Sequence, residues 1–218
     1  MALRVILGRP ISGKDEMSTL IDRFEWSGGH PALDFVNTLD DRPFERPVET
    51  LETYQDLVLF TELAGLIEPA VAQRLRARAG PSCLRIVTRA RALREHLFAI
   101  LTAVHAGEPA SRTDLERITV AALLARAARV LAAQTSSGLA SYRWRRPAAV
   151  ETPLHACALA VEDLLVMNVE HGRIRKCDAS DCEVYFIDTS KGRRRRWCSM
   201  ENCGNREKQR RWRAGGVS

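Results

Sequence analysis

Apolar residues recur three and four positions apart along most of the chain before Gly172, which is the spacing of one face of a helix. This pattern predicts five helices. They cover residues 53–64, 69–79, 82–106, 113–133 and 152–167. Thr113 begins a sequence with capping-box spacing, and Thr152-Pro153 supplies an N-cap followed by a proline at the first helical position.

Two shorter segments fit no long helix. Residues 26–38 contain a Gly28-Gly29 turn and then a short apolar stretch, whose spacing is compatible with a helix or with extended chain. Residues 142–145 alternate between aromatic and basic side chains, which predicts a brief strand. We therefore expect a mainly α fold, with a helical N-terminal domain followed by a small C-terminal module.

The balance of charge changes between about His171 and Arg175, and we expect the domain boundary there. The helical domain then covers residues 21–172 and the module covers residues 173–218. Residues 1–20 have no clear periodicity, so we expect a leader that need not be ordered, and Met17 is an equally good start.

Composition narrows the class of protein. With 218 residues, 45% of them hydrophobic, the chain is long enough for a substantial core. It contains neither an apolar run of membrane-spanning length nor a secretory signal, which predicts a cytoplasmic, nucleoid-associated protein with no membrane partner. No phosphate-binding glycine loop or nucleophile elbow is present, and the histidines in the helical segments lack metal-ligand spacing, so we expect no enzyme.

The net charge of +6 is concentrated in the C-terminal module. Residues 173–213 contain thirteen Lys and Arg against six Asp and Glu, or +7, so the remainder of the chain carries about −1. A small module of this charge predicts an anionic partner.

Four of the six cysteines lie in the same module, as Cys177-x4-Cys182 and, after fifteen intervening residues, Cys198-x4-Cys203. In a reducing compartment two short cysteine pairs predict a metal site, and four thiolates suit one structural Zn²⁺ with no open coordination position. Four unrelated thiols or two disulfides are the alternatives. Cys83 and Cys157 lie in helical segments and are expected to be buried as small apolar residues.

Between the cysteine pairs, residues 184–187 are strand-like and Lys191-Gly192 suits a turn, which favours a β-hairpin. Ser199 is a suitable N-cap for a helix from Met200 to about Arg213, with Cys203 near its start. A hairpin followed by a helix with the last ligand near its beginning is a treble-clef-like arrangement. A module this small needs the metal in order to fold.

Basic side chains surround this predicted zinc site and are the candidates for nucleic-acid binding, because several cations on one scaffold can contact several phosphates. They are Arg193, Arg194, Arg195, Arg196, Arg206, Lys208, Arg210, Arg211 and Arg213. The alternative is that these charges form a solvated face, or that arginine stems pack over the module. Trp197 could stack on a base or belong to the core beside the zinc, together with Phe186 and Ile187.

The module closely resembles the CGNR zinc finger, and residues 21–172 resemble its N-terminal partner, the ABATE domain. The residues that carry the two resemblances are Cys177-x4-Cys182, 186–190, 195–200 and Cys203-Gly204-Asn205-Arg206-Glu207-Lys208 for the finger, and 28–38 with Leu164-Leu165 for the domain. The resemblance implies a bacterial stress-induced transcription regulator in which the four cysteines bind zinc. Asn205 would then brace the zinc knuckle, and Arg206 would face a phosphate or a base edge.

From these observations we expect a DNA-binding regulator with duplex DNA as its partner. A module that binds single-stranded RNA and an adaptor that docks on an acidic protein remain alternatives. The helical domain could dimerise, or sense a small-molecule effector in a pocket built from His30, Asp34 and Asn37. The alternative is that Gly28-Gly29 makes a tight turn, Asn37 caps backbone groups and His30 is a surface or packing residue.

Overall fold

A computed structural model describes residues 21–133, 139–167 and 173–215. The expected leader over residues 1–20, and His171 and Gly172 at the expected domain boundary, lie outside these ranges. Within them, no helix combines the length and the apolar character needed to cross a lipid bilayer.

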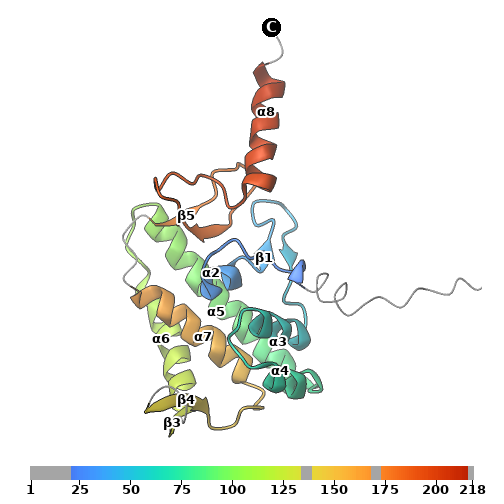
Figure 1. Ribbon diagram of the computed structural model, residues 1–218, viewed down its shortest axis with the longest axis vertical. Coiled ribbons are helices and arrows are strands. Elements are labelled where there is room, and N and C mark those ends of the chain that lie inside the picture. The colour runs from blue at the N-terminus through green and yellow to red at the C-terminus, as the bar shows by residue number, and fades with distance from the viewer. Residues whose placement is uncertain (1–20, 134–138, 168–172, 216–218) are drawn as a thin grey trace, which may run out of the picture.

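The N-terminal part of the molecule is helical, as predicted. Its helices are α2 (Pro31–Val36), α3 (Tyr54–Leu63), α4 (Pro69–Arg76), α5 (Pro81–His105), α6 (Arg112–Ala127) and α7 (Thr152–Val166). Two small antiparallel pairs accompany them, β1 (Leu39–Asp40) with β2 (Val48–Glu49) and β3 (Arg129–Ala133) with β4 (Ala140–Trp144). The long α5 lies at the centre, in contact with α2, α3, α6 and α7 (Figure 1).

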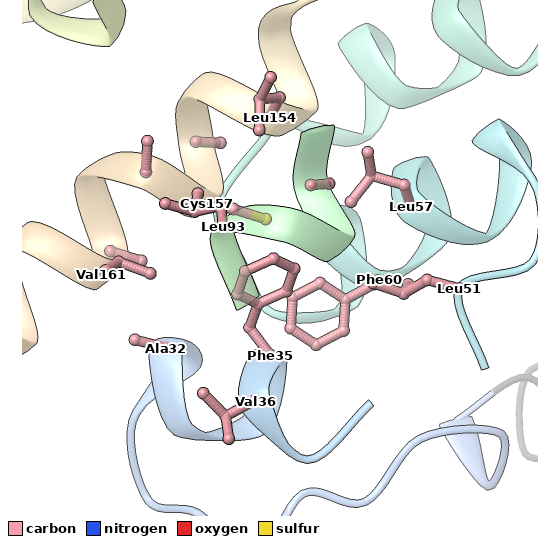
Figure 2. Packing of buried hydrophobic residues seen from close by; sticks show 14 of the residues in the cluster. Ala32, Phe35, Val36, Leu51, Leu57, Phe60, Leu93, Leu154, Cys157 and Val161 are labelled. Carbon is pink, nitrogen blue, oxygen red and sulfur yellow. The ribbon is translucent and has the colours of Figure 1, made fainter. Parts of the chain in front are cut away.

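One continuous apolar core fills the space between these helices. Phe35 of α2 and Phe60 of α3 meet with ring centroids 5.8 Å apart, and both side chains are buried. Figure 2 shows them facing Leu93 of α5 and Cys157 of α7. Cys157 is fully buried and Cys83 nearly so, which confirms that both pack as small apolar residues.

The segment that periodicity left open, residues 31–36, is the short helix α2. Pro31 occupies its first turn, and Ala32 N–H donates a hydrogen bond to Nδ1 of His30, the N-cap residue. Before it, the chain turns at Gly29, which has a φ of +74°. Gly28 lies so close to Asp34 that an added Cβ would be 2.9 Å from the Asp34 nitrogen and 2.7 Å from its Oδ1. A glycine at position 28 is therefore needed for this tight entry to the helix.

Three local predictions were wrong in detail. Residues 129–133 form the strand β3, not the end of a long helix, because they pair with β4 in register from Arg129 opposite Trp144 to Ala133 opposite Ala140. The N-cap of α6 is Ser111, whose hydroxyl accepts from Asp114 N–H, and not Thr113. Thr152 is the first residue of α7 and not its cap.

The C-terminal module has the predicted hairpin and helix. Strand β5 (Ile174–Lys176) pairs with β6 (Tyr185–Ile187), a π-helical turn follows over Met200–Gly204, and α8 covers Asn205–Gly215. The hairpin differs from the expected one, because the partner of β6 precedes the first cysteine pair. The loop between β5 and β6 therefore contains Cys177 and Cys182. Lys191-Gly192 forms a turn, and no strand follows it up to residue 215, where the described part of the chain ends.

Strand β6 joins the module to the helical domain. Side chains alternate across a strand, so Tyr185 and Ile187 belong to the helical core while Phe186 packs in a second apolar cluster with the cysteines. On the helical side Tyr185 meets Phe98 at 5.8 Å between ring centroids, and its hydroxyl lies 3.1 Å from Thr102 Oγ1. The module is thus packed directly on the helical domain, and α8 projects away from it at one end of the molecule (Figure 1).

Candidate zinc centre and the basic module around it

The four cysteines of the module form one compact cluster. The sulfur atoms of Cys177, Cys182, Cys198 and Cys203 all lie within 4.8 Å of one another. Cys182 Sγ is 3.8 Å from Cys198 Sγ, which is 3.5 Å from Cys203 Sγ. These separations are far longer than a disulfide bond of about 2.05 Å. They are close to the edge of about 3.8 Å expected for a tetrahedron with Zn–S bonds of about 2.3 Å.

Two tight turns bring the sulfur atoms together. In the first, between β5 and β6, Cys177 N–H donates to Val184 O at 2.9 Å and Cys182 N–H donates to Ala179 O at 3.1 Å. In the second, Ser199 caps the π-helical turn by accepting from Asn202 N–H at 3.2 Å, and Cys203 lies within that turn. Ser199 therefore has the capping role predicted for it, and Cys203 lies near the start of the helix as expected.

Nearby donors point at two of the sulfur atoms, and the thiols interact strongly with one another. Cys198 N–H points at Cys177 Sγ at 3.4 Å, and the Arg206 guanidinium donates to Cys203 Sγ at 3.3 Å. Hydrogen bonds from the Cys182 and Cys198 thiols lower the pKa of Cys177. In turn, the hydrogen bond with Cys177 raises the pKa of Cys182 and of Cys198, so one thiolate disfavours the next. Four thiolates at this distance require a cation between them.

The donor set, its burial and its spacing all fit one structural Zn²⁺. Cys177, Cys198 and Cys203 are buried and Cys182 is partly buried. Four sulfur ligands fill a tetrahedral zinc and leave no position for water or substrate. Bound there, the metal would cross-link the two turns and supply no chemistry of its own.

Asp188 organises the loop that leads to the second cysteine pair. Its carboxylate accepts from Ser190 Oγ at 2.6 Å, from Ser190 N–H at 2.9 Å and from Arg195 N–H at 2.9 Å. The hydrogen bonds, first that of the Ser190 hydroxyl, lower the pKa of this carboxyl group. Arg195 turns inward from the same loop, with its guanidinium 4.3 Å from the centre of the Phe186 ring and bonded to Trp197 O and Cys198 O.

Trp197 belongs to the core of the module. Its ring is partly buried against the cysteine cluster. The ring also packs closely on Gly204, because a Cβ atom added to that glycine would lie 3.3 Å from it. Arg196 covers it from outside, with 5.2 Å between guanidinium carbon and ring centre, and donates to Asp178 at 2.8 Å. Of the two roles considered for Trp197, its position corresponds to the packing role.

One face of α8 is held against the first cysteine turn. Arg206 and Arg210, four residues apart, share that face, and both donate to the carboxylate of Asp181 between Cys177 and Cys182. Arg210 also donates to Ser180 Oγ at 2.7 Å and to Glu207 at 2.6 Å. Asn205 Nδ2 donates to Glu201 O at 3.1 Å, which braces the π-helical turn. Arg206 and Arg210 therefore hold α8 against the turn that contains Cys177 and Cys182.

The opposite face of α8 is directed to solvent. Lys208, Arg211 and Trp212 lie three and four residues apart, so they form one stripe on the helix. All three are exposed, and Trp212 retains 81% of its surface. The side chains of Lys208 and Arg211 have no hydrogen bond or ion pair among the described residues. The same is true of the exposed side chains of Arg194 and Arg213, while Arg193 is also exposed and has a φ of +49°.

The three residues expected to line a ligand pocket each bond to another part of the protein. His30 Nε2 lies 3.3 Å from Asp163 Oδ2, and Asp34 Oδ1 accepts from Gly28 N–H at 2.9 Å. Asn37 bonds the backbone of Tyr185. The polar groups of all three residues therefore form hydrogen bonds within the protein. Such bonds are what the alternative to a ligand pocket predicts.

Sequence reasoning missed Asp181 and Asp188, which organise the basic residues. Asp188 left a weak local signal, because Asp-x-Ser is a common turn sequence in which the carboxylate accepts from the residue two positions later. Asp181 left none, because its two arginine partners follow 25 and 29 residues later.

Comparison with protein families agrees with this arrangement. The model of the ABATE family, described as a putative stress-induced transcription regulator, matches residues 29–168. The model of the CGNR zinc finger matches residues 173–215, which include all four cysteines and α8. Neither is a family of enzymes. No curated protein matches the sequence.

Proposed function

Because the chain belongs to the ABATE family and carries a CGNR zinc finger, we propose that it regulates transcription by binding duplex DNA through the outward face of α8. In this proposal Cys177, Cys182, Cys198 and Cys203 bind the zinc, and the zinc fixes the helix that presents the cations.

The division of cations on α8 carries the proposal. Arg206 and Arg210 are neutralised by Asp181 and Glu207, whereas Lys208 and Arg211 face solvent with no acidic partner among the described residues. A cation that has no protein partner can contact a phosphate without first breaking an ion pair. Lys208 and Arg211, together with Arg194 and Arg213, are therefore the phosphate contacts, and Arg195, Arg196, Arg206 and Arg210 support the scaffold.

The position of α8 suits this role. The helix projects from the end of the molecule, so a duplex can approach it without contacting the helical domain (Figure 1). An α-helix fits the major groove of B-DNA, and lysine and arginine along it reach the phosphates on either side. Four phosphate contacts predict that log K falls with log salt with a slope of roughly −3 to −4.

The direct test is binding of zinc-loaded protein to a labelled random-sequence duplex across a salt series, with a chelator-treated sample beside it. We expect binding that weakens along that slope and is lost when zinc is removed. Absence of binding in both states, or binding that is independent of zinc, would contradict the proposal.

Trp212 supports a second candidate, binding of single-stranded RNA. An exposed aromatic ring beside cations is the usual platform for stacking an unpaired base, and Trp212 is the most exposed aromatic side chain of the module. Competition between duplex DNA and single-stranded RNA at fixed salt separates the two candidates. Under the DNA proposal Trp212→Ala changes duplex binding little, and under the RNA alternative it weakens binding of the single strand strongly.

A further inference from the structure

A cleft lies at the end of the helical domain far from α8. Its walls are the turn before α4, the β3–β4 hairpin and α7, and its volume is about 1160 Å³, partly open to solvent. Figure 1 shows the hairpin at the opposite end of the molecule from α8. Small-molecule sites commonly have volumes of about 300–1,000 Å³, so there is room for a ligand of that size.

The floor of the cleft is apolar. Ile67 and Val71 approach from the turn and from α4, and Ala156 and Ala160 approach from α7, all with less than a tenth of their surface exposed. Leu159, partly buried, completes the floor on the α7 side. An apolar body placed here would be removed from water on several sides, which favours binding.

The acidic groups of the cleft are all paired. Glu62 pairs with Arg76, Glu68 with Arg143 at 2.9 Å, Glu162 with Arg126 at 2.8 Å and Asp163 with His30 at 3.3 Å. Three arginines line the cleft, and two of them, Arg126 and Arg143, belong to these ion pairs. The third, Arg129, has no carboxylate partner among the described residues.

Arg129 is instead held by aromatic rings. It lies opposite Trp144 in the β3–β4 pair, and its guanidinium carbon is 4.5 Å from the centre of the Tyr142 ring and 5.6 Å from that of Trp144. Trp144 in turn stacks on His155 of α7 at 6.3 Å between ring centroids. A guanidinium over aromatic faces keeps its N–H edge free to donate, and its planar fork matches a carboxylate.

We propose that this cleft binds a small molecule in which a carboxylate is joined to an apolar body. Arg129 donates two hydrogen bonds to the carboxylate, and the apolar body lies on Val71, Ala156, Leu159 and Ala160. This gives the helical domain a ligand site on side chains different from His30, Asp34 and Asn37, and it does not depend on nucleic-acid binding.

The test uses two probe pairs that differ only in charge, 2-naphthoate with 2-naphthalenemethanol and decanoate with decanol, titrated into the zinc-loaded full chain by calorimetry. We expect at least one acid to bind about tenfold more tightly than its alcohol, the effect of a charge-assisted hydrogen bond. Arg129→Gln should abolish that preference while the alcohol binds as before, which also shows that the variant is folded.

Arg112→Gln is the matched control, because Arg112 pairs with Glu116 on the exposed face of α6, outside the cleft. It should retain the wild-type preference. Equal binding of acid and alcohol, a preference that survives Arg129→Gln, or no binding of either acid would overturn the proposal.

Discussion

The Asn37 carboxamide makes both backbone hydrogen bonds of Tyr185, across 148 positions of sequence. Asn37 Nδ2 donates to Tyr185 O at 3.0 Å, and Tyr185 N–H donates to Asn37 Oδ1 at 3.0 Å. On the same edge of β6, Ile187 N–H donates to Gly28 O at 2.8 Å. The segment that contains α2 thus occupies the edge of β6 that β5 leaves open, and this fixes the zinc finger on the helical domain.

Replacing Asn37 with alanine should loosen the finger. The variant leaves two buried backbone groups of Tyr185 without partners, which costs about 2–4 kcal/mol of the free energy of unfolding. Chemical denaturation of the zinc-loaded protein measures the loss, and hydrogen exchange at the Tyr185 amide locates it. Asn202→Ala, at an exposed position of the finger, should change neither. Unchanged protection of the Tyr185 amide in Asn37→Ala would contradict this role.

Zinc content should depend on the clustered cysteines alone. Cys198→Ser replaces a thiolate ligand with a hydroxyl that stays protonated, so the purified variant should contain less than one zinc per chain and lose exchange protection in β6. Cys157→Ala, in the helical core, should retain one zinc per chain despite some loss of stability. Metal analysis beside hydrogen exchange separates the two, and full zinc content in Cys198→Ser would show that the ligand set is different.

Asp34 should make the protein less stable as pH rises through about 6. Burial, opposed by the Gly28 N–H hydrogen bond, raises the pKa of this carboxyl from 3.8 to about 6. Between these values the folded state binds more protons than the unfolded state, so the free energy of unfolding falls as pH increases. Above the folded pKa the charged carboxylate therefore costs about 3 kcal/mol.

Asp34→Asn tests this directly. Relative to wild type, it should be more stable near pH 7.5 and similar in stability near pH 4.5, and the comparison cancels the titration of the cysteines, which both proteins share. Asp22→Asn, at an exposed position, should follow wild type at both values. An Asp34→Asn difference that is the same at both pH values would rule out the raised pKa.

The sequence predicted the helices and the zinc cluster well, because both leave short-range signals. Helical spacing identified α3, α4, α5 and α7, and the two Cys-x4-Cys pairs identified the metal site. Residues 129–133 were wrongly assigned to a helix, because Ala and Leu favour helices and only the pairing with residues 140–144 makes them a strand.

The organisation of the basic residues could not be predicted, because it depends on contacts between distant positions. Arg206 and Arg210 lie on one face of α8, and Asp181, which neutralises that face, precedes them by 25 and 29 positions. For the same reason Arg195 was grouped with the other arginines, although it packs inward on Phe186. The sequence alone could not separate scaffold cations from exposed ones.

The outward face of α8 is the proposed DNA-binding surface, and two double variants with the same net charge test whether DNA binds there. The double variant Lys208→Ala, Arg211→Ala removes two exposed cations from the finger. The double variant Arg112→Ala, Arg117→Ala removes two from the exposed surface of α6 and leaves the same net charge. Binding of both zinc-loaded proteins to a random-sequence duplex across a salt series is the measurement. We expect the first to bind more weakly, with a salt slope smaller in magnitude by about 2, and the second to bind as wild type. Equal binding by the two variants would contradict DNA binding through α8, because the affinity would then depend only on the net charge of the protein.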